Sequence, residues 1–274
     1  MNPPGAMTTV PTIAVHVFRE SVRDKVLYNL VAFAVLMMGA SYMIGQLTVG
    51  QDMKIIKDLG LAATSLFGLF IAVFIGIGLV SKEVERRSIY ALLSKPVRRQ
   101  HLILGKYGGL LLTLFVNIAA MTLALYAVLG IMIFTQPPQA KLIWEAPALD
   151  PALLKAVLLI YAELAIITAC ALFFSSFSTP ILSAAFTVGL FIIGQFNADL
   201  KHFENVVSSR PAAWMARVLY YTLPNLAPFD VKAAVVHGQP VATGYILLTL
   251  AYAAAYIAVL LLMTTMIFVR RDFK

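Results

Sequence analysis

The chain has 274 residues, of which 61% are hydrophobic and 12% charged, and its formal net charge is +8 at pH 7. Soluble domains average about 45–50% apolar and about 25% charged residues, so this composition excludes a soluble globular protein and predicts an integral membrane protein. The basic residues flank apolar segments, so we expect membrane lipid rather than nucleic acid as their partner. Because apolar segments fill most of the sequence, we expect a single transmembrane domain over residues 1–274.

The first predicted element is an amphipathic helix over residues 12–25. Ile13, Val17, Phe18 and Val22 would lie on one face of this helix, with the charged side chains largely on the other. Two placements agree with this pattern: an ordinary soluble helix, or a helix lying in the inner membrane interface. The interface is favoured, because the chain offers little soluble core to cover the apolar face.

Six apolar segments are candidate membrane spans, for which about 20 residues are needed. Their apolar runs are continuous rather than alternating, which indicates an all-α bundle in which every backbone group bonds within its own helix. The candidate spans are residues 26–47, 59–80, 107–134, 153–174, 180–196 and 245–269. The fifth is short, and it either crosses with little tilt or stops within the membrane.

Lysine and arginine residues set the expected orientation. If both termini are cytoplasmic, 13 of the 21 basic residues lie on the inner side, as the positive-inside rule requires. We therefore expect a multi-pass protein of the plasma (inner) membrane. On the outer side, residues 197–244 are too polar to span and too apolar to be a free loop. They predict short helices at the outer surface, with Trp214, Tyr220 and Tyr221 at headgroup depth.

The most charged segment lies between the second and third candidate spans, from Lys82 to Lys106. It carries seven basic residues and two acidic ones, so it should stay on the cytoplasmic side. The pattern indicates two short helices separated near Ser94 and Pro96, because proline suits a first helical turn and breaks a helix interior. A helix pair of this kind favours a docking surface. The alternative is a basic anchor that fixes topology and binds no partner.

Sequence motifs for chemistry within this chain are missing. A phosphate-binding loop needs G-x-x-x-x-G-K-[ST], whereas the sequence around Gly105 and Lys106 has Gln100 and Tyr107 at the other required positions. The four histidines are far apart in the sequence, and the single cysteine, Cys170, cannot form an intrachain disulfide. We expect no catalytic residues, no metal site and no cofactor bound by this chain.

Glu163 is the only acidic residue inside a candidate span. A carboxylate at mid-span is costly and usually faces a bundle interior or a wet cavity, so Glu163, together with Asn117, is a candidate for a translocation path. Glu163 would there bind a cationic group or take up a proton. Alternatively it is a neutral structural residue, bonded to a neighbouring helix through Tyr161, Thr168 or Asn117. Both interpretations stay open.

The charged segment carries the pattern Glu83-x-Glu85, Ser88, Leu92-Leu93, Ser94-x-Pro96, Arg99 and Gly105-Lys106. This pattern resembles the cytoplasmic loop of type-2 ABC transporter permeases. In that family the loop follows the second of six spans, and an amphipathic N-terminal helix and a re-entrant outer segment are also similar to the pattern here. The chain departs from many relatives at Arg86 and Arg87, where they have glycine, and at Ser88, where they have threonine.

The resemblance implies that a separate ABC-type ATPase docks on this loop and on the N-terminal helix. ATP and Mg would be held by that ATPase, and a second copy of the permease would complete a homodimer. The residues expected to dock are Glu83, Glu85, Arg86, Arg87, Tyr90, Leu92, Leu93, Pro96 and Arg99. The apolar ones would enter a groove and the charged ones would set the register.

The function expected from this resemblance is that of a permease subunit coupling ATP hydrolysis to substrate export or extraction. Two alternatives remain. One is a polytopic membrane enzyme acting on lipid, for which Glu163, Asn117 and Gln195 offer few polar groups. The other is a non-transporting membrane coupler driven by an ATPase.

Overall fold

The computed structural model describes residues 6–46, 52–85, 99–136, 147–196 and 222–270, with single positions at 211, 214, 217, 218 and 220. These residues form helices and short connections, and no strand occurs among them. The long helices are α1 (Ala6–Val22), α2 (Lys25–Gln46), α3 (Asp52–Glu85), α5 (Arg99–Thr135), α7 (Ala152–Ser175), α8 (Pro180–Gln195) and α12 (Thr243–Arg270). Two short helices, η2 (Ala227–Phe229) and α11 (Lys232–Val236), precede α12.

Five of these helices are long and apolar enough to cross a membrane, namely α2, α3, α5, α7 and α12. They confirm five of the six predicted spans. The remaining one, the fifth candidate at residues 180–196, is not confirmed, because α8 has only 16 residues. At 1.5 Å per residue this helix is about 24 Å long, whereas the hydrocarbon core of a bilayer is about 30 Å thick.

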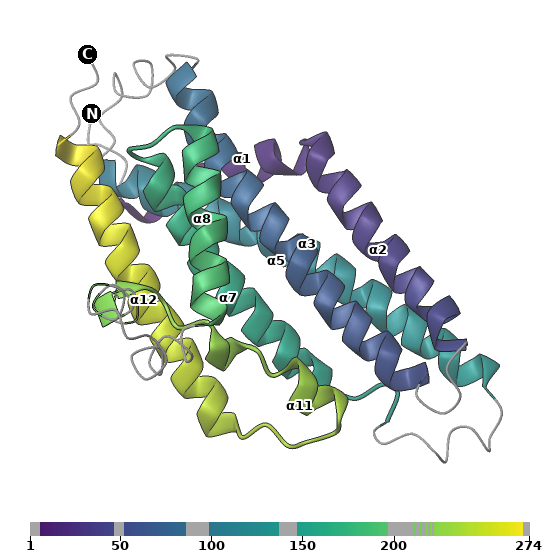
Figure 1. The fold of residues 1–274 in the computed structure, drawn as a ribbon. Helices are drawn as coiled ribbons and strands as arrows, with labels where there is room; N and C mark the ends of the chain where they lie inside the picture. The colour runs from purple at the N-terminus through teal and green to yellow at the C-terminus, as the bar shows by residue number, and fades with distance from the viewer. Residues whose placement is uncertain are drawn as a thin grey trace.

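The helices run alternately up and down, and the two ends of the bundle differ (Figure 1). The α1 helix, the end of α3 and the start of α5 lie at one end, which we call the α1 end. The short helix α11 lies at the other, which we call the α11 end. At 34 and 37 residues, α3 and α5 extend over about 51 Å and about 55 Å. Both therefore continue well beyond a bilayer core.

The amphipathic N-terminal helix is confirmed, and its apolar face packs along α5. Val17 is buried, Ile13 and Phe18 are half-buried, and Arg19 and Glu20 are exposed, as the sequence pattern predicts. The helix is therefore held by contacts within the protein. A membrane interface is not needed to explain burial of its apolar face.

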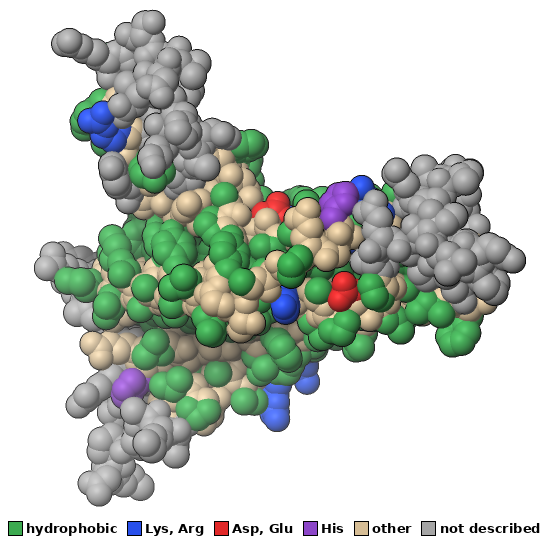
Figure 2. Space-filling view, turned by 90° about the horizontal axis from the view of Figure 1, so that it is seen from below, with side chains coloured by type: hydrophobic (Ala, Val, Ile, Leu, Met, Phe, Trp, Pro, Cys, Tyr) green, Lys and Arg blue, Asp and Glu red, His purple; other side chains and the backbone are tan. Residues whose placement is uncertain are grey.

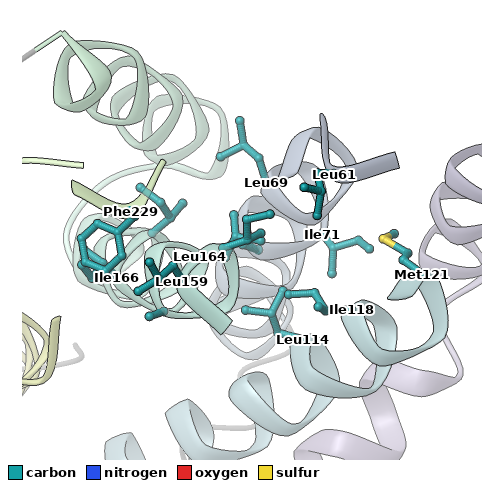
Figure 3. Packing of buried hydrophobic residues seen from close by; sticks show 14 of the residues in the cluster. Leu61, Leu69, Ile71, Leu114, Ile118, Met121, Leu159, Leu164, Ile166 and Phe229 are labelled. Carbon is teal, nitrogen blue, oxygen red and sulfur yellow. The ribbon is translucent and has the colours of Figure 1, made fainter. Parts of the chain in front are cut away.

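The core lies where α3, α5 and α7 meet. Leu61 and Ile71 of α3, Leu114 of α5, and Leu159 and Leu164 of α7 are all fully buried (Figure 3). The central helix is α7, since it contacts α3, α5, α8, α12 and both short helices. By contrast, α2, α8 and α12 expose many large apolar side chains, as helices facing lipid do. The view from below Figure 1 shows hydrophobic side chains over much of the coloured surface, with few charged ones (Figure 2).

Residues 222–236, here called the inserted segment, include both short helices. Leu226, Phe229 and Val235 are completely buried, against elements that include α3 and α7. The expected short helices are therefore present, and their apolar side chains pack inside the bundle while Asp230 and Ala233 are exposed. Their position at the outer surface of the membrane stays a prediction. The apolar side chains of the segment fill space that α8 leaves open in the bundle. Trp214 is 68% exposed, and Tyr221 lies outside the described residues.

The contact between α1 and α5 predicts an effect of glycine substitution. A Cβ added at Gly109 would lie 2.6 Å from Ala14 O and 2.6 Å from Val17 Cβ, so Gly109→Val should displace α1. We expect a loss of about 1–3 kcal/mol in unfolding free energy, which is typical of overpacking. The measurement is reversible unfolding in detergent micelles.

Gly130→Val is the matched control, because an added Cβ at Gly130 on the same helix meets nothing within 4 Å. The control carries the same change in helix propensity. Equal losses in the two variants would contradict close packing of α1 on α5.

Candidate functional site

The structure places the ends of the predicted docking loop but describes little of the loop itself. Glu83 and Glu85 belong to the last turns of α3, and Arg99 is the first residue of α5. The other predicted docking residues lie outside the described part of the chain, namely Arg86, Arg87, Tyr90, Leu92, Leu93 and Pro96. Docking at these positions therefore stays a prediction.

The start of α5 forms a glycine seat for α1. A Cβ added at Gly105 would lie 2.7 Å from Ile13 Cβ, and one at Gly109 would lie 2.6 Å from Ala14 O. These two glycines are four residues apart, so they share one helix face and let the two backbones approach closely. The segment predicted to dock therefore precedes, in the sequence, a point where α5 contacts α1 closely. This close contact was not predicted from the sequence, although the small-xxx-small spacing of Gly105 and Gly109 is a signal for it.

Two tyrosines link α5 to α7 in opposite directions. Tyr107 on α5 donates a hydrogen bond to Ala165 O on α7 at 3.0 Å, and Tyr161 on α7 donates to Leu111 O on α5 at 3.3 Å. Because each hydroxyl bonds a carbonyl of the facing helix, the two helices are fixed both along and around their axes. A displacement of α5 at the α1 end would thus be passed to α7.

Glu163 lies midway along α7 and is 1% exposed. Gln195, the last residue of α8, donates a hydrogen bond from Nε2 to Glu163 Oε1. The structural interpretation named Tyr161, Thr168 or Asn117 as partners, and each of these instead bonds a backbone carbonyl. Tyr161 bonds Leu111 O, whereas Thr168 and Asn117 bond Leu164 O and Thr113 O of their own helices. The structure thus pairs Glu163 with Gln195, whereas the Asn117 side chain bonds the backbone of its own helix.

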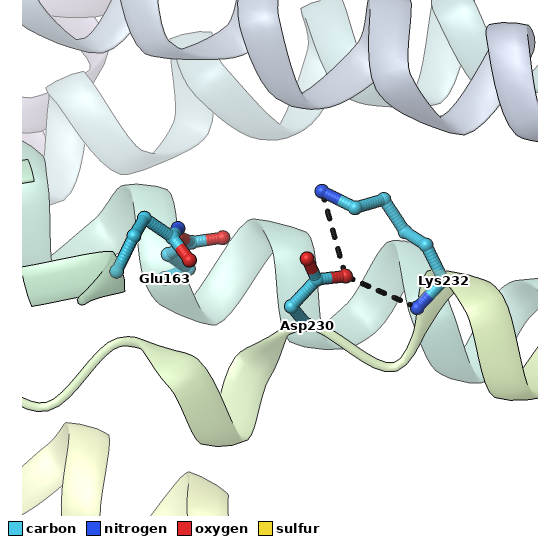
Figure 4. Close-up of polar contacts among 4 residues, drawn as sticks. Glu163, Asp230 and Lys232 are labelled. Atoms are coloured by element: carbon cyan, nitrogen blue, oxygen red, sulfur yellow. Dashed lines mark hydrogen bonds and ion pairs between the residues drawn. The ribbon is translucent and has the colours of Figure 1, made fainter. Parts of the chain in front are cut away.

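A charge pair on the inserted segment stands beside this carboxyl group. Lys232 Nζ lies 3.6 Å from Asp230 Oδ1, and both side chains are close enough to Glu163 to interact with it electrostatically. Figure 4 shows the pair next to Glu163. We call Glu163, Gln195, Asp230 and Lys232 the polar cluster. Three elements supply it, namely α7, α8 and the inserted segment.

Two of the four residues of the polar cluster were not predicted from the sequence. Asp230 and Lys232 lie far from Glu163 in the sequence, within residues expected at the outer surface. The available signal was the presence of two opposite charges among apolar residues just before the last span. Among the described residues, no group of three or more His, Cys, Asp or Glu could hold a metal ion. The arrangement suits recognition of a charged or polar group.

A fold of five long apolar helices around a partly polar interior defines a polytopic helical membrane protein. The sequence model of the ABC-2 family transporter proteins matches residues 12–273, which is nearly the whole chain. The chain belongs to this family and is a membrane permease of the ABC transporter class. A comparison with curated proteins gave no significant match.

The bond between Gln195 and Glu163 makes a prediction about stability. Gln195→Leu should lower the unfolding free energy in detergent by about 1–3 kcal/mol, because it leaves a buried carboxyl group without this donor. Asn117→Leu is the control, since the Asn117 amide bonds a carbonyl that its own helix can satisfy, and its effect should be smaller. A larger loss in the control would show that the Gln195 contact contributes little.

Proposed function

We propose that this permease couples ATP hydrolysis by a separate ABC-type ATPase to export or extraction of a substrate. It would act as a homodimer in the plasma (inner) membrane, with both termini in the cytoplasm. The observation that carries this proposal is the family match over residues 12–273. The sequence supports a separate ATPase, because the chain has no phosphate-binding loop of its own.

The contacts at the α1 end support a mechanical route for the coupling. Residues 86–98, which contain most of the predicted docking positions, connect the end of α3 to the start of α5 in the sequence. An ATPase that grips the loop would move these two helix ends, and the glycine seat would make α1 move with α5. The Tyr107 and Tyr161 bonds then connect α5 to α7, which carries Glu163. A force applied at the loop would in this way reach the polar cluster.

The proposed docking surface can be tested with the intact protein. A tagged chain, purified in mild detergent from its native host, should co-purify with a protein that contains a phosphate-binding loop. Leu93→Asp should abolish this co-purification, because a charged side chain cannot enter an apolar groove without a large desolvation cost.

Gln239→Asp is the matched control, since it adds the same charge at an exposed position near the α11 end. It should leave the complex intact. Retention of the ATPase by Leu93→Asp, with this control also normal, would show that the docking surface is elsewhere.

The role of Glu163 in transport makes a second prediction. In a reconstituted complex with the ATPase, Glu163→Gln should retain assembly and basal ATP hydrolysis but lose stimulation by every active compound of a substrate panel. The amide keeps the shape of the side chain and removes its ability to carry charge. Glu20→Gln, an exposed change on α1, is the control. Normal stimulation in Glu163→Gln would assign Glu163 a structural role alone.

A further inference from the structure

The carboxyl group of Glu163, when ionised, has no cation within ion-pair distance among the described residues. Lys232 is close enough to attract it, but Lys232 Nζ lies 3.6 Å from Asp230 Oδ1, so these two charges balance each other. The carboxyl group accepts a hydrogen bond only from the neutral amide of Gln195 in that part of the chain. A charge in an apolar interior is costly unless an opposite charge reaches it, so Glu163 needs either a proton or a cationic ligand.

The face of α7 that carries Glu163 is turned toward aromatic side chains. Four residues at spacings of four, three and four lie on one face of this helix. They are Leu159, Glu163, Ile166 and Cys170. Phe229 lies beside Leu159 and Ile166, which stand one turn before and one turn after Glu163 (Figure 3). Further along the same face, Cys170 is close enough to two tyrosines of α12 to interact with their hydroxyl groups electrostatically.

These two tyrosines, Tyr252 and Tyr256, continue the line of rings that begins at Phe229. The ring centroids of Phe229 and Tyr252 are 6.3 Å apart, and those of Tyr252 and Tyr256 are 6.1 Å apart. We call these three side chains the aromatic row. The Tyr252 hydroxyl accepts a hydrogen bond from Asn225 N, and the Tyr256 hydroxyl donates one to Thr222 O. Both hydroxyl groups are therefore occupied, and the rings offer their faces to a ligand.

The surroundings of Glu163 suit an organic cation better than a metal ion. Mg²⁺ and Ca²⁺ need about six to eight oxygen ligands, and the described residues offer no group of three or more His, Cys, Asp or Glu. Cys170 stands about 10 Å along the helix from Glu163, too far for the two to share a metal ion. An organic cation needs one opposite charge and a surface for its apolar part, and aromatic faces attract a cation directly.

We propose that Glu163 and the aromatic row bind the substrate of this permease, and that this substrate is an organic cation with one positive charge and an apolar body. This proposal rests on the proposed transport function and adds the chemical class of the cargo. The carboxylate pairs with the charge, the rings cover the apolar part, and Gln195 positions the carboxylate. Because Glu163 is 1% exposed and Tyr252 is 38% exposed, the row meets the cation first, and the packing around α7 must open before the charges pair.

Binding can be tested on the intact chain in detergent, without an ATPase. The probe is tritium-labelled tetraphenylphosphonium, an apolar cation with one charge, and tetraphenylborate is the matched anion of nearly the same size and shape. We expect saturable binding of the cation and no competition by the anion. Glu163→Gln should raise the Kd at least about tenfold, because it removes the group that pairs with the charge.

Tyr252 provides a second and independent pair of variants. Tyr252→Leu should raise the Kd about three- to tenfold, because the ring face is lost. Tyr252→Phe keeps the ring and should bind within about twofold of the unmodified protein. Phe115→Leu is the matched control, since it removes a ring that is 55% exposed on α5, outside the aromatic row, and it should leave the Kd unchanged.

Several results would overturn the proposal. They are the absence of saturable cation binding, equal binding of tetraphenylborate, and an unchanged Kd in Glu163→Gln. Equal losses in Tyr252→Phe and Tyr252→Leu would show that the ring face is not used. An equal loss in Phe115→Leu would show that the cation binds apolar surface in general. Either of these last two results also overturns it.

The binding result is independent of the proposed function as a whole. If an ABC-type ATPase co-purifies while the cation does not bind, the substrate class fails and the coupling role stands. If the cation binds as expected but no ATPase is found, the binding site stands and the coupling role fails.

Discussion

The helix α8 ends inside the bundle, and the arrangement of α7, α8 and the inserted segment depends on this constraint. In an apolar environment, backbone groups without a partner are costly, so a helix that ends inside the bundle needs protein partners for its last carbonyl groups. Leu226 N supplies one such bond to Gly194 O, and Gln195 at the same helix end turns its amide to Glu163. The inserted segment is therefore needed to complete the bundle, and it brings Asp230 and Lys232 with it.

A buried charge elsewhere in the bundle is also satisfied by a group from a connection between helices. Lys57, near the start of α3, is 1% exposed, and its ammonium group donates to Pro147 O at 2.7 Å, with Asp150 close enough to attract it. Asp150 is itself held by its backbone, since its carbonyl accepts a bond from Tyr126 on α5 at 2.9 Å. Each of these contacts joins a helix to a connection between helices. At the α11 end, hydrogen bonds from polar side chains to backbone carbonyl groups thus surround an apolar core. Such an arrangement agrees with a position where this end meets water.

The α1 end is built differently, from close backbone packing. Gly105 and Gly109 let α1 lie directly on α5, and the Tyr107 and Tyr161 bonds fix α5 against α7. Both ends therefore use hydrogen bonds from buried polar side chains to backbone carbonyl groups, and the α1 end adds van der Waals contact between two helix backbones, which water cannot replace.

The sequence by itself determined the class, the helical fold and most helix positions, because 20-residue apolar runs and amphipathic spacing are local signals. It identified α1 by the spacing of Ile13 and Val17, and it singled out Glu163 as the acid within a span. Only the tertiary structure decided that Gln195, rather than Asn117, bonds Glu163, and that Asp230 and Lys232 lie beside it. It also showed which apolar side chains of the segment before α12 pack inside the bundle, namely Leu226, Phe229 and Val235. These facts depend on where α8 ends relative to α7, a relation between residues distant in the chain that no local pattern encodes.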